Sequence, residues 1–130
     1  MELLQIGEVS ARTELSIKTI RHYDDVGLVV PSARSAGGFR LYTGDDVARL
    51  IAIRRMKPLG FTLEEMRELL DALDVLDDGT SSGAERVRAT DALAEFHRRA
   101  ADACATLTKQ LGYARELTEQ LARYRPDELR

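Results

Sequence analysis

The residues with the clearest chemistry lie in one stretch, residues 16–23, which reads Ser-Ile-Lys-Thr-Ile-Arg-His-Tyr. Its polar side chains form a compact set of cations, hydrogen-bonding groups and one aromatic ring: Lys18, Thr19, Arg21, His22 and Tyr23. Such a set offers donors both to phosphate oxygens and to the edges of bases. The stretch therefore predicts a segment that binds DNA in the major groove.

A short helix is needed to hold these side chains on one surface. Ser16 is a good N-cap residue, so the helix should begin there. Ile17 and Ile20 are three residues apart, which predicts that both lie on its inner side. The helix should end near Val26, with Gly27 as the left-handed residue that follows it.

A second short helix should precede this one, and a winglike hairpin should follow it. Ile6, Val9 and Leu15 supply the apolar positions of the first helix and the turn after it, which together predict a helix-turn-helix. Glu14 occupies the turn position where glycine is common. Residues 34–42 are typical of a hairpin that turns at Gly37-Gly38.

Strand alternation in this hairpin separates its side chains into two sets. Phe39 and Leu41 should face one side, and Arg40 and Tyr42 the other. The wing would then present Arg34, Arg40 and Tyr42 beside the recognition helix. Two alternative interpretations remain open: Arg40 is paired with an acidic neighbour in the wing, and Tyr23 is mainly a core ring whose hydroxyl reaches solvent.

Three further helices are indicated by their start signals. Thr43, Thr62 and Ser82 are each followed three residues later by a carboxylate, the pattern of a capping box. Met66, Leu69, Leu70 and Leu73 form the predicted inner stripe of the second of these helices. The third should run to about Tyr124, just before Pro126.

This last helix carries an apolar seam at heptad spacing. The seam consists of Leu93, Phe96, Ala100, Ala103, Leu107, Leu111, Ala114, Leu117 and Leu121. A helix of roughly 40 residues is roughly 60 Å long, too long for a domain of this size to cover. We therefore expect a homodimer. The length of the helix alone does not fix its orientation, but an antiparallel pair would separate the two DNA-binding domains and place them on successive turns of one DNA face. The predicted fold is mainly α, with a DNA-binding domain at 1–76, a loop at 77–83, and a dimerisation helix with a short tail at 84–130.

Composition narrows the function classes. The net charge is −3, but residues 1–60 hold nine Lys and Arg against seven Asp and Glu, whereas residues 61–130 hold ten against fifteen. The more basic half can therefore meet phosphates.

The sequence also argues against several other classes of function. Cys104 is the one cysteine, and its distance from His97 along the helix is too large for both side chains to bind one ion, so we expect no metal and no cofactor. The sequence has no signal-peptide pattern and no membrane span, which favours the cytoplasm. It also has no nucleophile–base pair, so we do not expect an enzyme.

Several separated motifs resemble the MerR family of bacterial transcription regulators, over roughly residues 4–75. They are Ile6-Gly7-Glu8-Val9, Thr19-Ile20-Arg21-His22-Tyr23, Gly27-Leu28, Gly38-Phe39-Arg40-Leu41-Tyr42 and Gly60-Phe61-Thr62-Leu63-Glu64-Glu65. Members usually have two aromatics and a glutamate where this chain has His22-Tyr23-Asp24, and tyrosine where it has Phe39.

The resemblance implies a mechanism and a set of site residues. Such dimers bind a near-palindromic operator in double-stranded promoter DNA, and bend and untwist an overlong spacer so that RNA polymerase can engage both promoter elements. On the recognition helix that Ser16 caps, the implied DNA contacts are Lys18, Arg21 and Tyr23. On the wing they are Arg34, Phe39 and Arg40. Lys57 is a further implied phosphate contact, and Arg54 is a neighbouring candidate. An alternative is an architectural or recombination accessory protein that bends DNA without controlling a promoter. A small effector could bind near Met66, Leu70 and Phe96.

Overall fold

The computed structural model describes residues 2–124; residues 125–130, which include the predicted tail, lie outside the described residues. The elements follow in the order β1 (Leu4–Gln5), α1 (Ile6–Thr13), α2 (Ile17–Asp25), β2 (Ala33–Arg34), β3 (Arg40–Tyr42), α3 (Gly44–Met56), the short 3-10 helix η1 (Lys57–Leu59), α4 (Leu63–Asp77) and α5 (Gly83–Ala122). The mainly α winged helix-turn-helix fold with a long C-terminal helix is therefore confirmed.

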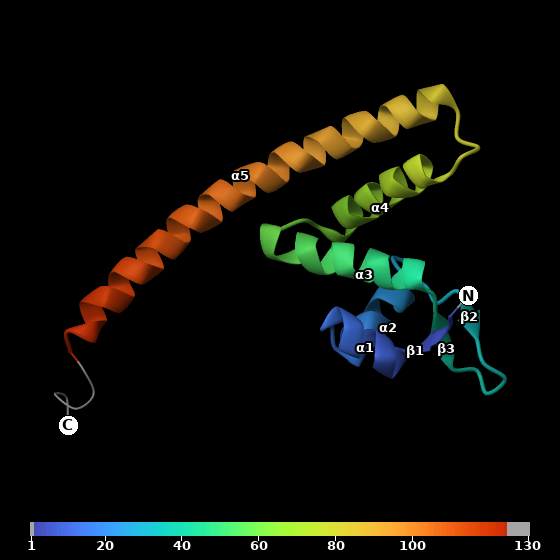
Figure 1. Ribbon diagram of the computed structural model, residues 1–130, viewed down its shortest axis with the longest axis horizontal. Coiled ribbons are helices and arrows are strands. Elements are labelled where there is room, and N and C mark those ends of the chain that lie inside the picture. Colours follow the sequence, from blue (N-terminus) through green and yellow to red (C-terminus); the bar gives the residue numbers. More distant parts are fainter. Residues whose placement is uncertain (1, 125–130) are drawn as a thin grey trace.

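The elements form a small head and a long rod (Figure 1). In the head, α1, α2 and the sheet lie on one side of α3, and α4 lies on the other. The first part of α5 runs back along α4, and the rest extends away from the head. None of the helices in residues 2–124 combines the length and apolar character that a bilayer crossing requires.

The sheet contains one strand more than the predicted hairpin. Its order is β1-β3-β2, with both pairs antiparallel, and Leu4 of β1 lies opposite Tyr42 of β3. β1 was not predicted because a strand of two residues carries no alternation pattern. It fixes β3 against the start of α1, so the wing is anchored on both sides.

The helix starts lie where the capping signals predicted them. Complete capping boxes precede α3 at Thr43, α4 at Thr62 and α5 at Ser82. At the first of these, Asp46 accepts a hydrogen bond from the Thr43 backbone nitrogen at 2.9 Å. Gly27 follows α2 with φ of +72°, which confirms the left-handed residue after the recognition helix.

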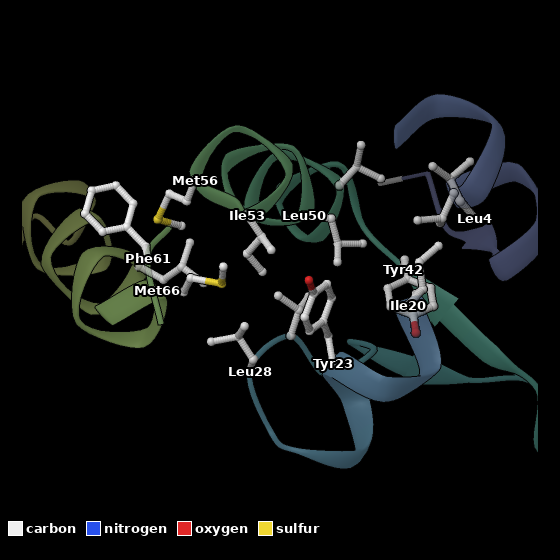
Figure 2. Packing of buried hydrophobic residues seen from close by; sticks show 14 of the residues in the cluster. Leu4, Ile20, Tyr23, Leu28, Tyr42, Leu50, Ile53, Met56, Phe61 and Met66 are labelled. Atoms are coloured by element: carbon white, nitrogen blue, oxygen red, sulfur yellow. The ribbon is translucent and has the colours of Figure 1, made fainter. Parts of the chain in front are cut away.

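The head core gathers around α3. Leu50 and Ile53 are fully buried there and lie in one cluster with Ile20 of α2 (Figure 2). Leu70 of α4 belongs to the same cluster. The prediction that Ile17 lies on the inner side of α2 is wrong, because 37% of its surface is exposed. Ile20 and Tyr23 are the buried pair instead, and they have the same three-residue spacing.

Leu73 and Phe96 also lie in environments other than the predicted ones. Leu73 of α4 lies at the edge of the core, and 36% of its surface is exposed. Phe96 of α5 was predicted to lie in the dimer seam, but it belongs to the core of its own head. Its ring packs edge-on against Phe61 at 5.7 Å between centroids. Where α5 runs alongside α4, an apolar residue at a heptad position can therefore pack within its own chain instead of against a second copy.

Farther along α5 the seam has no cover within the described chain. Leu107, Leu111, Leu117 and Leu121 are all exposed, with Leu121 at 55%. They continue the face of α5 that begins at Ala89 and Phe96, which are buried against the head. One apolar face is therefore covered by α4 in its first half and exposed to solvent in its second.

Candidate nucleic-acid interface

The turn between α1 and α2 sets the angle at which α2 leaves the head. Glu14 follows the last residue of α1 and adopts the left-handed conformation, with φ of 61°. Among residues 2–124 it is the one residue other than glycine that has a positive φ. The Thr13 hydroxyl donates to the Val9 carbonyl at 2.8 Å, and the Ser10 hydroxyl donates to the Leu15 carbonyl at 2.6 Å. The Leu15 backbone nitrogen in turn donates to the Thr13 hydroxyl at 3.2 Å, so the Thr13 and Ser10 side chains pair both backbone groups of Leu15 within the turn.

Arg54 of α3 also holds this turn. Its Nη1 donates to the Thr13 carbonyl at 2.8 Å and to the Glu14 carboxylate at 3.0 Å. The sequence offered Arg54 as a candidate DNA contact. The structure instead gives its guanidinium a partner within the head, 41 residues away along the chain.

The recognition helix α2 presents the predicted cations to solvent. The Ser16 hydroxyl caps the helix by accepting a hydrogen bond from the Thr19 backbone nitrogen at 3.0 Å. Lys18, Arg21 and His22 are exposed, and Thr19 is half-buried. Because Ile20 and Tyr23 hold the opposite side in the core, the polar side of α2 faces outward.

The two tyrosines of the predicted site are core residues. Tyr23 is only 3% exposed and Tyr42 is fully buried, so the prediction that their side chains lie on the DNA-binding surface is wrong (Figure 2). Neither hydroxyl has a hydrogen-bond partner among the described residues. Burial raises the pKa of Tyr42 above its ordinary value, and the nearby Asp24 carboxylate adds to the rise.

The alternation of β3 explains the error at Tyr42. Arg40 and Tyr42 share a face as predicted, but that face is turned toward α2 and the core. Arg40 Nε donates to Asp24 Oδ2 at 2.7 Å, and this bond raises the pKa of the Arg40 guanidinium. Arg40 is thus paired with an acidic neighbour, as the alternative interpretation held, although the acid lies on α2 rather than in the wing.

Asp24 also attracts the second arginine of the wing. Arg34 Nη2 lies 3.6 Å from Asp24 Oδ2, and Arg34 Nη1 donates to the Gly38 carbonyl at 3.1 Å. The Asp24 side chain is 13% exposed, whereas that of Arg34 is 51% exposed. Asp24 therefore fastens the wing to the recognition helix, and Arg34 keeps part of its guanidinium available on the surface.

The tip of the wing is a tight turn that carries an exposed ring. Gly38 has φ of +82°, and its backbone nitrogen donates to the Ser35 carbonyl at 2.9 Å. The positive φ favours glycine at position 38, and a Cβ at Gly37 would lie 3.1 Å from the Phe39 ring, which would have to shift slightly. Phe39 is 69% exposed, which confirms that the wing presents this ring to its surroundings.

Two shallow grooves show that these elements form one surface. One, of about 140 Å³, places Arg21 beside Phe39 and Arg40 of the wing. The other, of about 390 Å³, places Lys18 and Thr19 beside Lys57 of η1. Lys18 and Arg21 lie on the same helix, so we group α2, the wing and η1 as the recognition surface, defined by the cations Lys18, Arg21, Arg34 and Lys57 and by the Phe39 ring.

Arg67 of α4 was not foreseen in this arrangement. Its two terminal nitrogens donate to the carbonyls of Gly27 and Val26, at 2.9 and 3.0 Å, where α2 ends. A cation is favourable at a helix C-terminus, where backbone carbonyls lack intrahelical partners. No local sequence signal reveals this contact, because Arg67 and Gly27 are 40 residues apart.

Comparison with known proteins gives consistent matches along the chain. Residues 4–73 match the profile described as MerR HTH family regulatory protein, and residues 47–111 match the profile described as MerR, DNA binding. The transcriptional regulator HmrR of Rhizobium leguminosarum bv. viciae is 40% identical over 96 residues, which cover 74% of this chain and 72% of HmrR.

Two further matches show how much of the sequence and of the fold this chain shares with other proteins. Nodulation protein NolA of Bradyrhizobium sp. (strain NC92) is 34% identical over 83 residues, 64% of this chain, and the chain spans only 35% of NolA. The crystal structure of HiNmlR, described as a family regulator lacking the sensor domain and bound to promoter DNA, superposes with a TM-score of 0.69 at 18% identity, over 98% of this chain and 94% of that one. The second match shows a shared fold.

Proposed function

The chain belongs to the MerR family of DNA-binding transcription regulators, and we propose that it binds a near-palindromic promoter operator as a homodimer and distorts the spacer to control RNA polymerase. One observation carries the proposal. The exposed cations Lys18 and Arg21 lie on a capped helix between the wing, which contributes Phe39 and Arg34, and η1, which contributes Lys57. A helix in the major groove with basic projections on the flanking backbone is a common arrangement for reading DNA.

The direct base contacts are assigned to the first turns of α2. Lys18 and Arg21 can donate to base edges or phosphates, and Arg to guanine is a frequent specific pairing. Arg34 and Lys57 reach the flanking phosphates, which supply affinity but carry no sequence information. Arg40 and Arg54 act from beneath this surface, by holding the wing and the turn in place.

Dimerisation is supported by the uncovered half of α5. Leucines at 107, 111, 117 and 121 are exposed along one face of a helix that extends beyond its own head. Such a face is stabilised when a second copy covers it. An antiparallel pair would hold the two heads apart on one side of the duplex, as a two-fold operator requires.

The proposal is tested by binding and transcription on the same promoter fragment. Genome-wide mapping of bound sites supplies the fragment, and fluorescence anisotropy measures its affinity over a range of salt concentrations. We expect specific binding that weakens steeply as salt rises, because phosphate contacts release counterions. In vitro transcription should then change when the protein is added. Binding that leaves transcript levels unaltered would contradict promoter control.

A further inference from the structure

The larger groove of the recognition surface has the properties of a small-molecule site. It occupies about 390 Å³ between α2, η1 and the first turn of α4. Its lining consists of Lys18, Thr19, His22, Tyr23, Lys57, Phe61, Leu63 and Met66. This volume lies within the range of roughly 300–1,000 Å³ that is usual for ligand pockets.

The lining divides into an apolar floor and a basic rim. Tyr23, Phe61 and Met66 form the floor and are buried in the core of the head (Figure 2). Lys18 and Lys57 are exposed at the rim, and neither forms an ion pair within residues 2–124. The lining contains no acidic residue. The groove therefore combines a surface for a ring or branched chain with two ammonium groups for a negative charge.

We propose that this groove binds a small organic anion, a carboxylate on an aromatic or branched apolar body, and that the bound anion weakens DNA binding. The apolar body lies against Phe61 and Met66, and the carboxylate faces Lys18 and Lys57. Both lysines belong to the recognition surface, so an anion there neutralises charges that would otherwise meet phosphates. By linkage, DNA must weaken anion binding by the same factor. The effect of the anion on DNA binding, which is the regulatory half of the proposal, rests on the proposed function.

Through Phe61, the floor of the groove is also in contact with the long helix α5. The Phe61 ring packs against Phe96, and the Arg99 guanidinium lies 4.8 Å from the Phe61 ring centroid. Arg99 in turn pairs with Glu65 of α4. The sequence had placed an effector near Met66, Leu70 and Phe96. Leu70 and Phe96 are core residues, and of these three only Met66 lines the groove.

The first test uses 2-naphthoate and the full chain without DNA. In a ¹H–¹⁵N NMR titration we expect saturable shifts at the residues that line the groove. The neutral isostere 2-naphthalenemethanol should bind at least about tenfold more weakly, because it lacks the charge that the lysines attract. Equal binding of the two compounds, shifts centred elsewhere, or no saturation by about 5 mM naphthoate, weaker than the millimolar range of marginal binding, would overturn the site.

A matched pair of variants locates the site on α4. Leu63→Glu places a carboxylate at the rim, at a side chain that is 37% exposed, and should weaken naphthoate binding at least about tenfold through like-charge repulsion. Leu73→Glu makes the same change on the same helix outside the groove, at a side chain that is 36% exposed, and should leave naphthoate affinity unchanged. Equal effects of the two substitutions would contradict the assignment.

The regulatory half is tested with labelled promoter DNA in fluorescence anisotropy. Saturating naphthoate should lower the DNA affinity of the wild-type chain several-fold relative to sodium acetate at equal concentration. Leu63→Glu, compared with its own value without naphthoate, should show no such response. Naphthoate binding with unaltered DNA affinity would refute the regulatory half. Failure to bind DNA in acetate would instead refute the proposed function, while the naphthoate titration without DNA still decides the site.

Discussion

At the scale of single residues, two arginines near the recognition helix have different environments. Arg21 is exposed on α2 and has no ion-pair partner within the described residues. Arg40 is bonded to Asp24, and its side chain is 24% exposed. An unpaired guanidinium is available to a base or a phosphate, whereas a paired one must first exchange its partner. Arg21 is therefore the arginine for which we propose a base contact, whereas Arg40 holds the wing against α2 through Asp24.

Arg21→Ala should weaken specific operator binding by about 1–3 kcal/mol, the usual contribution of an arginine that reads a base. The measurement is anisotropy against the operator and against a scrambled duplex of equal length. Arg115→Ala, which removes an exposed cation from α5, provides the control and should leave the affinity near that of the wild type. Equal losses in both variants would show that net charge, rather than the position of Arg21, determines binding.

The tyrosines show what residue type alone leaves undecided. Tyr23 and Tyr42 occur among cations and glycines, a context in which a phenol hydroxyl commonly meets phosphate. Both rings are nevertheless buried. A tyrosine has an apolar body and a polar tip, so its type is compatible with either environment. Which environment it occupies depends on how strands and helices pack, and the partners involved are distant in the sequence.

At the scale of elements, the turn before α2 stores backbone strain. Glu14 adopts φ of 61°, a conformation that costs a residue with a side chain roughly 1–2 kcal/mol. Its carboxylate recovers part of this by pairing with Arg54 at 3.0 Å, although the Glu14 side chain is 80% exposed and an exposed pair contributes little. The strain should therefore exceed the gain from the pair.

Glu14→Gly should accordingly stabilise the protein, by roughly 0.5–1 kcal/mol, because glycine adopts positive φ without a steric penalty. Glu8→Gly is the matched control, since Glu8 lies within α1, where glycine destabilises a helix by roughly 0.5–1 kcal/mol. Urea unfolding monitored by circular dichroism measures both. Opposite signs are expected, and destabilisation by Glu14→Gly would mean that its pair with Arg54 outweighs the strain.

The elements were predictable where their signals are local. Ser16, Thr43, Thr62 and Ser82 cap the helices that the sequence assigned to them. Apolar periodicity likewise predicted the long helix, which ends at Ala122 rather than at about Tyr124. The contacts that position the recognition surface were not predictable in this way. Asp24 with Arg40, Arg54 with Thr13 and Arg67 with Gly27 each join residues that local patterns cannot connect.

At the scale of the whole molecule, the exposed leucines in the second half of α5 are the feature that supports the proposed homodimer. Leu107→Glu places a charge in the middle of the exposed face and should convert the dimer into a monomer, because a buried unpaired carboxylate is costly. Ala105→Glu introduces the same charge on the opposite side of the helix and should leave the dimer intact. Sedimentation velocity distinguishes the two, and a dimer that survives Leu107→Glu would show that the seam is assigned to the wrong face.

The packing of α5 against α4 should also respond to acid. The Thr62 backbone nitrogen, and then Arg99, donate to the Glu65 carboxylate and lower its pKa below the ordinary value of 4.5. A carboxyl with a lowered folded-state pKa contributes stability above its unfolded value, and that stability is lost as pH falls through the folded value. Glu65→Gln should therefore destabilise the protein at pH 7 but much less below the folded pKa. A difference in thermal unfolding that is the same at both pH values would contradict this role.

The division of one α5 face between α4 and solvent has a kinetic consequence. The contacts of Phe96 with Phe61 form within a single chain, so they can be completed before two molecules meet. Refolding should then show a fast phase whose rate is independent of protein concentration, followed by a bimolecular phase whose rate rises in proportion to it. If the proposed dimer forms, a newly synthesised molecule would have a folded head before its α5 is paired. A cell that makes few copies would then hold mostly folded monomers that cannot yet bind a two-fold operator.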